Sequence, residues 1–257
     1  MQDSNTHQLN RVAGLTVFFW IVKILSTTVG ETAADFIAVN MKVGLIGTTL
    51  LMGIVTIAAI VWNFKQKKYL APTYWFLIVM MSIEGTLITD ILVDNFSVSL
   101  ITLDIVFTTM MAIGFYVWYK AERTLSIHKI NNDKRERFYW LIVLITFALG
   151  TGVGDTVSEH LSFGYLNSLM LFGGIFVVAG GLFYAKILNG VTTFWIAFIV
   201  TRPIGASLGD LFIQTPADGG LGISAGTINI TFFAIIIVVV TYLSMTKMDI
   251  AESVSSE

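Results

Sequence analysis

Residues 19–35 read FWIVKILSTTVGETAAD, an apolar segment in which Trp20 is followed ten residues later by Gly30 and fifteen residues later by Asp35. The same spacing returns three times along the chain. The further sets are Trp75, Gly85 and Asp90, then Trp140, Gly150 and Asp155, and finally Trp195, Gly205 and Asp210. An aromatic residue precedes every one of these tryptophans. Because the same spacing recurs at similar distances along the chain, it indicates that the chain is four copies of a single unit.

Each copy contains two apolar runs that are long enough to cross a bilayer, for which about 20 residues are needed. The predicted transmembrane helices are 12–34, 42–62, 72–92, 97–119, 138–158, 163–185, 191–213 and 223–245. The corresponding repeats are approximately 12–65, 70–120, 137–187 and 190–247. Because every unit contains two spans, all four units have the same orientation. Rotation about the membrane normal is therefore expected to relate them.

The composition agrees with a protein that lies in lipid. Hydrophobic residues make up 55% of the chain and charged residues 12%, against about 25% charged in soluble proteins. The mean hydropathy is +0.80. We therefore predict an all-α, polytopic integral membrane protein that forms a single membrane domain over residues 1–257, with the bilayer as its main partner.

The composition also excludes several classes of function. The chain has no cysteine and three histidines, which removes thiol catalysis and thiolate or iron–sulfur sites and leaves little for haem or zinc. A net charge of −2 is too small to indicate a nucleic-acid partner. No cofactor is expected, apart from a bound cation, and the sequence gives no expectation about oligomeric state.

Basic residues are concentrated in the connections between units and beside the two chain ends. Only Lys42 lies in a connection between the two spans of one unit, which is on the opposite side of the membrane. The twelve on the basic side are Arg11, Lys65, Lys67, Lys68, Lys120, Arg123, Lys129, Lys134, Arg135, Arg137, Lys186 and Lys247. Six of them fall in a basic linker over residues 120–137. By the positive-inside rule, this linker and both termini are expected to be cytoplasmic.

The chain resembles a family of bacterial membrane-anchored proteins that are built from four tandem repeats of unknown function, each with two transmembrane segments and a characteristic tryptophan. The four repeated tryptophans carry this resemblance, together with residues 26–35, STTVGETAAD, and residues 194–203, FWIAFIVTRP. The resemblance implies eight spans in a bacterial inner membrane. It implies no activity and no functional residues.

The repeated tryptophans and glycines are expected to be structural. Each tryptophan opens the first span of its unit, and Trp62 and Trp118 end second spans on the same side, so an aromatic belt at the headgroups is the expected arrangement. Each glycine lies five residues before the repeated aspartate, where it would permit close contact between helices or a local opening of the helix. Close contact is the favoured interpretation.

Carboxylates accumulate inside the predicted spans. The spacing places the four aspartates about 22 Å from the tryptophans along a helix, in the outer half of the bilayer. Seven acidic side chains lie in the spans: Glu31, Asp35, Glu84, Asp90, Asp104, Asp155 and Asp210. Only Lys23 and Arg202 are basic there. They could form fixed pairs, Lys23 with Glu31 or Arg202 with Asp210, or act as counter-ions that are released when a cation binds.

A cluster of intramembrane carboxylates needs a partner, a water-filled cavity or a bound cation. Because hydroxyl groups surround these carboxylates, a hard cation such as Mn²⁺, Mg²⁺, Ca²⁺ or Na⁺ is the expected ligand. The leading hypothesis is a secondary transporter of a small cation, an exporter or antiporter that exchanges it for protons, and not an enzyme.

Three alternatives stay open. A cation channel is the nearest, since the same acidic site would serve it. An intramembrane aspartyl protease would match Gly152-Val-Gly-Asp155, although this short pattern is better explained by drift of the repeat. The third alternative is a structural or sensory subunit, in which the aspartates only form hydrogen bonds to neighbouring helices or cap them.

Overall fold

The structure, a computed structural model, describes residues 10–250. Within this part of the chain there is no strand, and eight helices are long and apolar enough to cross a membrane. They are α1 (Val17–Asp35), α2 (Leu45–Gln66), α3 (Ala71–Asp90), α4 (Leu100–Glu122), α5 (Asp133–Asp155), α6 (Tyr165–Tyr184), α7 (Gly190–Ile213) and α8 (Ala225–Thr246). The predicted all-α, multi-pass membrane fold with eight transmembrane helices is confirmed.

Some helix bounds differ from the prediction. The first helix starts at Val17 and not at residue 12, because residues 12–16 run over the end of the bundle. Helix α5 starts at Asp133, inside the predicted basic linker, and the side chain of Asn132 caps it by accepting from the Arg135 amide at 2.9 Å. The non-helical part of that linker also holds a short 3-10 turn, η3 (Ile127–Lys129).

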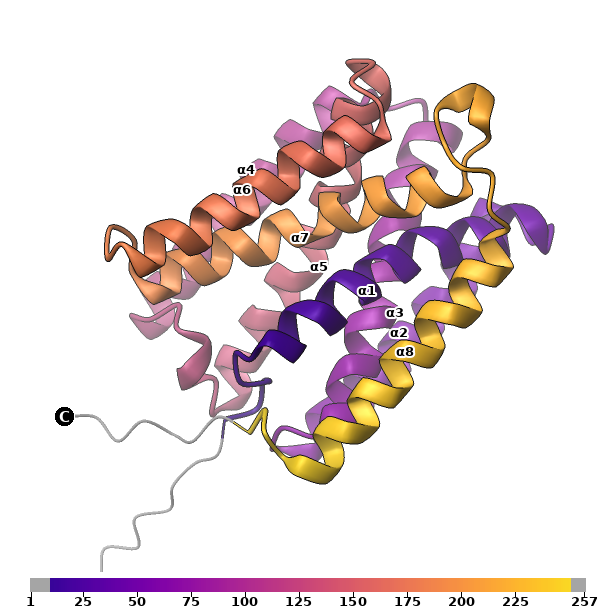
Figure 1. Ribbon diagram of the computed structural model, residues 1–257. Coiled ribbons are helices and arrows are strands. Elements are labelled where there is room, and N and C mark those ends of the chain that lie inside the picture. Colours follow the sequence, from indigo (N-terminus) through magenta and orange to yellow (C-terminus); the bar gives the residue numbers. More distant parts are fainter. Residues whose placement is uncertain (1–9, 251–257) are drawn as a thin grey trace, which may run out of the picture.

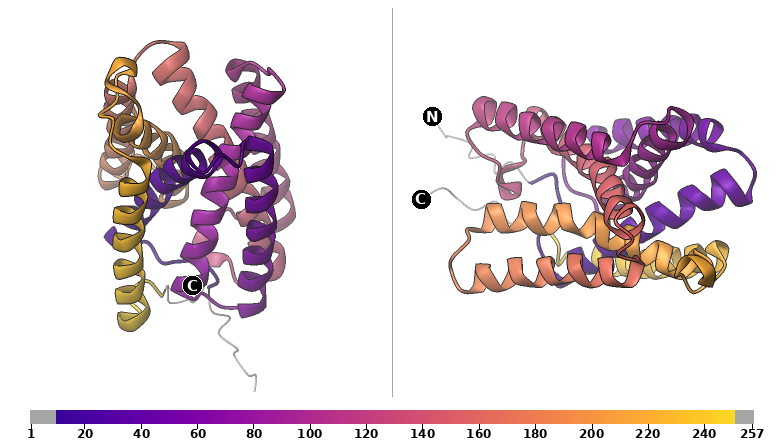
Figure 2. Two further views of the ribbon diagram at one scale, coloured as in Figure 1. Left: turned by 90° about the vertical axis from the view of Figure 1, so that its right-hand side faces the viewer. Right: turned by 90° about the horizontal axis from the view of Figure 1, so that it is seen from above.

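The odd-numbered helices form a closed ring in the order α1, α3, α5, α7 and back to α1, which we call the odd-helix ring. Each even-numbered helix packs on the outside of the next ring member: α2 on α3, α4 on α5, α6 on α7 and α8 on α1. Figure 1 shows α8 alongside α1 and α6 alongside α7, and Figure 2 places α4 and α6 at opposite edges of the bundle. The four two-helix repeats therefore follow one another around a common axis.

The ring helices are mostly buried and the outer helices mostly exposed. Exposure of apolar outer helices is the expected arrangement in lipid, where helix contacts depend on close packing and not on exclusion of water. The ring is thus the solid interior of the protein, and a site built from its inward side chains is shielded by a second layer of helices.

The repeated glycines lie where adjacent ring helices touch, and the contact is the same at every interface. A Cβ atom added to the glycine would lie between 2.0 and 2.6 Å from a side-chain atom of the next unit. In every case that partner lies three residues before the next unit's glycine: Gly30 meets Ser82, Gly85 meets Phe147, Gly150 meets Arg202 and Gly205 meets Thr27. The close-contact role predicted for these glycines is confirmed.

Replacing Gly205 with alanine is expected to lower the free energy of unfolding by about 1–3 kcal/mol, as overpacking of a filled interface does. The new Cβ would lie 2.7 Å from the backbone carbonyl carbon of Thr27, so the helices must move apart. Gly174→Ala on the lipid side of α6 is the matched control, because its Cβ meets nothing within 4 Å. Thermal unfolding in detergent measures both, and equal melting temperatures would contradict the packing role.

The end of the ring that carries the basic connections is covered by residues 10–16 and 247–250; we call it the basic end. Arg11 pairs with Glu136 at 2.8 Å, and the amide of Gly14 donates to the carbonyl of Asp249 at 2.7 Å. The Tyr69 hydroxyl donates to the Asp249 carboxylate. Burial and this hydrogen bond raise the pKa of Tyr69 above its usual value, so the donor proton is retained. Polar contacts therefore tie the covering segments to the connections beneath them.

Candidate functional site

Side chains at every fourth residue of the ring helices form successive layers across the ring. Residues four apart share one face of a helix, and each step advances about 6 Å. From the basic end, the layers are the aromatic layer (Phe19, Tyr74, Tyr139, Phe194), the Lys23 layer (Lys23, Ile78, Val143, Phe198), the Arg202 layer (Thr27, Ser82, Phe147, Arg202), the Glu31 layer (Glu31, Thr86, Thr151, Ala206) and the Asp layer (Asp35, Asp90, Asp155, Asp210). Every residue of the first four layers is buried.

The aromatic layer and the repeated tryptophans close the ring near its basic end. Each layer residue contacts the tryptophan of the next unit with ring centroids 5.3–6.2 Å apart: Phe19 with Trp75, Tyr74 with Trp140, Tyr139 with Trp195 and Phe194 with Trp20. The expected aromatic belt is wrong for four of the six tryptophans, since Trp75, Trp118, Trp140 and Trp195 are at most 5% exposed. These indoles fill the space between helices, and only Trp62 is largely exposed.

Lys23 is fully buried, and its ammonium group has no hydrogen-bond partner among residues 10–250. The nitrogen lies between two aromatic rings, 4.2 Å from the centroid of Phe147 and 4.1 Å from that of Phe198. The negative faces of the rings offset part of the cost of removing the charge from water. The predicted pair with Glu31 is not formed, and sequence analysis missed this enclosure because the two rings come from different units.

Arg202 links all four helices of the odd-helix ring. Its Nη2 atom donates to the Glu31 carboxylate at 2.8 Å, to the Thr151 hydroxyl at 2.7 Å and to the Thr86 hydroxyl. Its Nη1 atom donates to the carbonyl of Thr27 at 3.2 Å. The side chain starts on α7 and reaches α1, α3 and α5, so one guanidinium group fastens the ring across its axis.

The ion pair differs from the predicted one, which joined Arg202 to Asp210. Arg202 lies two helical turns before Asp210, but its side chain extends only one layer toward it and meets Glu31 there. Glu31 takes that position because α1 is the neighbour of α7 in the ring. A pair between the first and the last unit depends on ring closure, which the linear sequence does not reveal.

The Asp layer lies at the opposite end of the ring, which we call the acidic end. Asp35, Asp90 and Asp155 are half-buried and Asp210 is 5% exposed. The charge of Glu31 interacts with all four of these carboxyl groups. The structure thus brings together five of the seven predicted acidic residues in two successive layers at one end of the ring.

Three of the four repeated aspartates are followed directly by a wide π-helical turn. These turns are η1 (Phe36–Asn40), η2 (Ile91–Asn95) and η4 (Thr156–His160). In unit four, α7 ends three residues after its aspartate, and a longer loop with the 3-10 turn η5 (Pro216–Asp218) follows. Residues 36–40, predicted as a connection, therefore belong to the helix. Single π-helical turns are rare and are frequent at functional sites.

A polar cavity of about 510 Å³ opens beside the Asp layer at the acidic end. Glu159, Tyr165, Gln214 and Asp218 are among its lining residues, and the Tyr165 hydroxyl donates to Glu159 at 2.8 Å. Glu159 also interacts electrostatically with three of the repeated aspartates, Asp35, Asp155 and Asp210. The cavity extends the acidic surface away from the ring.

Two predicted acidic residues lie outside the central group. The side chain of Glu84 faces α2, where its Oε1 atom is 3.4 Å from the position of a Cβ on Gly53. Asp104 lies between α4 and α5 and accepts from the Thr156 hydroxyl at 2.6 Å. The sequence prediction grouped Glu84 and Asp104 with the other five acidic residues because all seven lie in spans at similar depth. Depth alone does not give the direction in which a side chain points.

The carboxylates of the Asp layer do not form a ready metal centre. Within residues 10–250, no group of three His, Cys, Asp or Glu side chains lies close enough to hold a metal ion. The carboxylates at the acidic end therefore surround a wide acidic region, and their oxygen atoms would have to converge to coordinate an ion.

A family model described as Repeat of Unknown Function (DUF347) matches four times, at residues 18–69, 73–124, 138–186 and 193–249. Each match contains one ring helix and one outer helix. No curated protein and no solved structure matches the chain.

Proposed function

The chain belongs to the Repeat of Unknown Function (DUF347) family, and from the geometry of its ring we propose that it is a secondary transporter of a small cation, an exporter or antiporter. The proposal includes a bacterial inner membrane and a basic end on the cytoplasmic side, which the positive-inside rule supports. The acidic end then faces away from the cytoplasm. The observation that carries the proposal is five carboxyl groups gathered at one end of a ring whose only charge partner there is Arg202.

A carrier is favoured over a channel because the other half of the ring is filled. The aromatic, Lys23 and Arg202 layers are at most 3% exposed, and residues 10–16 lie across the basic end. An ion that enters from the acidic end meets packed side chains beyond Glu31. Transport through such a ring requires a change of conformation, as a carrier undergoes and an open pore does not.

The ligand chemistry supports a hard cation, with a divalent ion such as Mn²⁺ ahead of Na⁺. Carboxylate and hydroxyl oxygens line the Glu31 and Asp layers, without thiolate or imidazole. Because these oxygens are spread apart, binding would draw the acidic ends of the ring helices together, and the π-helical turns that follow Asp35, Asp90 and Asp155 are suited to that adjustment.

Arg202 supplies a route by which ion binding and conformation are coupled. A cation near Glu31 competes with the guanidinium group for the same carboxylate, and release of Arg202 would also free Thr86 and Thr151. Since these contacts hold the ring helices together, losing them would loosen the half of the ring that the aromatic, Lys23 and Arg202 layers fill. Protonation of the repeated aspartates would release the cation, and the ionised Glu31 would then pair with Arg202 again, which makes protons the natural exchange partner.

The glycines of the Gly152-Val-Gly-Asp155 segment have a packing role that supports a transporter over a protease. A Cβ on Gly152 would lie 2.5 Å from the Asp104 carboxylate, and one on Gly154 would lie 3.3 Å from the Cβ of Ala206. Helix contacts thus account for both glycines without a catalytic role.

Cation binding is expected to stabilise the purified protein. At a concentration one hundred times the Kd, a ligand that binds only the folded state adds about 2.7 kcal/mol. We expect such a rise in thermal stability with at least one of Mn²⁺, Mg²⁺, Ca²⁺ and Na⁺, and its loss in Asp35→Asn and Asp90→Asn. Asp104→Asn is the matched control outside the central group. Stabilisation of none of these proteins, or equal stabilisation of all of them, would remove the support for a cation site.

A further inference from the structure

A second cavity, of about 800 Å³, lies on the side of the bundle near the basic end. Its walls come from the start of α1, the end of α6, the start of α7 and the turn η3. We call it the lateral pocket. It shares no residue with the Asp, Glu31 or Arg202 layers, so what it binds is independent of the proposed transport site.

The lateral pocket exists because one unit lacks an aromatic side chain that another unit has. On α4, Phe115 and Trp118 pack against Trp195 with ring centroids 4.9 and 5.7 Å apart. Units two and three are 65 residues apart, so Gly180 of α6 corresponds to Phe115. The space that Phe115 fills beside Trp195 is open beside Trp20.

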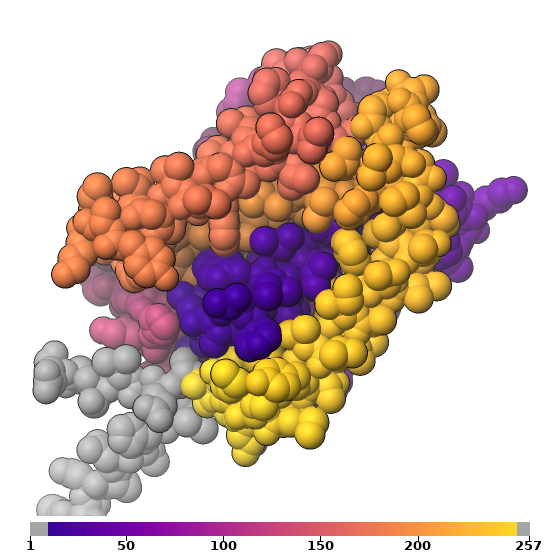
Figure 3. All heavy atoms as spheres, viewed as in Figure 1, coloured from indigo at the N-terminus to yellow at the C-terminus, as the bar shows by residue number. Residues whose placement is uncertain are grey.

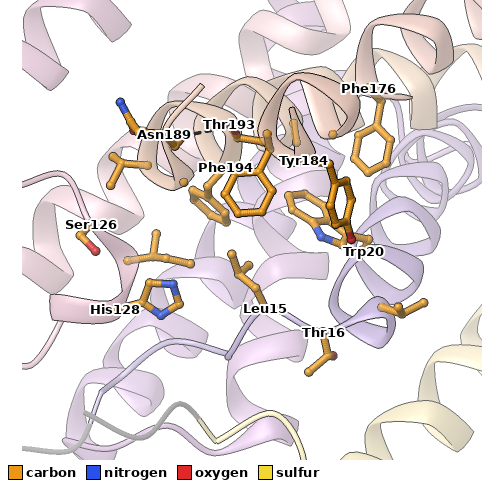
Figure 4. Close-up of a pocket in the computed structure, with 17 residues that line it drawn as sticks. Leu15, Thr16, Trp20, Ser126, His128, Phe176, Tyr184, Asn189, Thr193 and Phe194 are labelled. Atoms are coloured by element: carbon orange, nitrogen blue, oxygen red, sulfur yellow. Dashed lines mark hydrogen bonds between the residues drawn. The ribbon is translucent and has the colours of Figure 1, made fainter. Parts of the chain in front are cut away.

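The lining of the lateral pocket is amphipathic. Its aromatic part is formed by Trp20, Phe176, Phe183, Tyr184 and Phe194. Figure 4 shows Trp20, Phe176 and Tyr184 on one side of the pocket and Ser126, His128 and Asn189 on the other. An occupant with an apolar tail and a polar head matches this division.

The pocket belongs to a recess on the lipid-facing side of the protein. Figure 3 shows the surface of α1 set back between α6 and α7 on one side and α8 on the other. Apolar side chains of α1 are exposed in this region, with Val17 at 74% and Ile21 at 42%. In a bilayer this surface is in contact with lipid chains and not with water.

The basic residues around the lateral pocket favour lipids with anionic headgroups. The connections at this end carry most of the lysines and arginines of the chain, and Lys129 and Lys186 follow the lining residues His128 and Tyr184 closely in sequence. Among the residues lining the pocket there is no carboxylate. Clustered basic residues beside a membrane attract anionic headgroups.

We infer that the lateral pocket binds one anionic phospholipid, with an acyl chain against Trp20 and Phe176 and the headgroup beside Ser126, His128 and Asn189. Because the pocket is bounded by both α1 and α7, the bound lipid contacts the ring interface at which the first and last units meet. The corresponding space beside Trp195 is filled by Phe115 and is not available to a lipid.

Quenching of tryptophan fluorescence by brominated phosphatidylglycerol tests the site directly. Trp62→Phe is used as the background, which leaves Trp20 as the tryptophan within reach of lipid, because the other four are at most 5% exposed. Gly180→Phe should fill the pocket, since its Cβ meets no atom within 4 Å. Gly174→Phe on the exposed side of the same helix is the matched control.

Brominated phosphatidylglycerol is expected to quench the background protein and the Gly174→Phe variant with equal affinity. Gly180→Phe should weaken binding about tenfold or more, which corresponds to displacing roughly two methylene groups from the pocket. Brominated phosphatidylcholine should bind more weakly than phosphatidylglycerol in the background protein. Equal affinity for the two lipids, or unchanged quenching in Gly180→Phe, would overturn the proposal, as would an equal loss in Gly174→Phe. The melting temperature of each variant confirms that it is folded.

Discussion

Replacing Arg202 with methionine is expected to reduce the free energy of unfolding by about 3–5 kcal/mol, the usual effect of removing one partner from a buried ion pair. The substitution keeps most of the side-chain volume but leaves the Glu31 carboxylate, 6% exposed, without its counter-ion. It also removes the donors that Thr86 and Thr151 accept from. Thermal unfolding in detergent measures the loss.

Lys23→Met provides the contrasting control, because Lys23 is equally buried but has no anionic partner. Methionine keeps the apolar contacts with Phe147 and Phe198 and removes a charge that only the aromatic rings stabilise, so we expect a neutral or stabilising effect. Adding Glu31→Gln to Arg202→Met should recover part of the lost stability, since no charge is then left unpaired. A neutral Arg202→Met, or an equally costly Lys23→Met, would contradict the assignment of Arg202 as the fastening group.

The apolar runs and the repeat spacing together were sufficient to predict the membrane fold. The distances from tryptophan to glycine and aspartate depend on a single helix, so they placed Gly30 and Asp35 correctly relative to each other and to their equivalents. The close-contact role of the glycines also followed from one helix, because a residue without a side chain permits an approach whichever helix is the neighbour.

Features that depend on the order of helices around the ring could not be read from single helices. Trp75 looked like an interfacial residue by its place near a helix start, but the ring turns it toward Phe19 of the preceding unit. Glu31 meets Arg202 because the last unit closes on the first. Glu84 was grouped with the central acids by depth, although its direction, toward α2, depends on which outer helix covers α3.

Neutralising the repeated aspartates is expected to reduce cation exchange strongly while the fold survives. In proteoliposomes, Asp155→Asn and Asp210→Asn should reduce counter-ion-dependent uptake of the transported cation by about tenfold to a hundredfold, since a lost charged contact is worth about 1.5–3 kcal/mol. Asparagine keeps the size of the side chain and part of its hydrogen bonding. The melting temperatures should therefore change little in the absence of the cation.

Glu84→Gln and Asp104→Asn are the matched controls, because both remove an intramembrane carboxylate that lies outside the central group: Glu84 faces α2, and Asp104 lies between α4 and α5. If the Asp layer is the ion site, these variants retain exchange that saturates with substrate and depends on a counter-ion. Uniform loss in all four variants would mean that the total intramembrane charge matters and the Asp layer does not. Flux that does not saturate in wild type would favour a channel, and retained exchange in both Asp155→Asn and Asp210→Asn would leave the repeated aspartates with an architectural role.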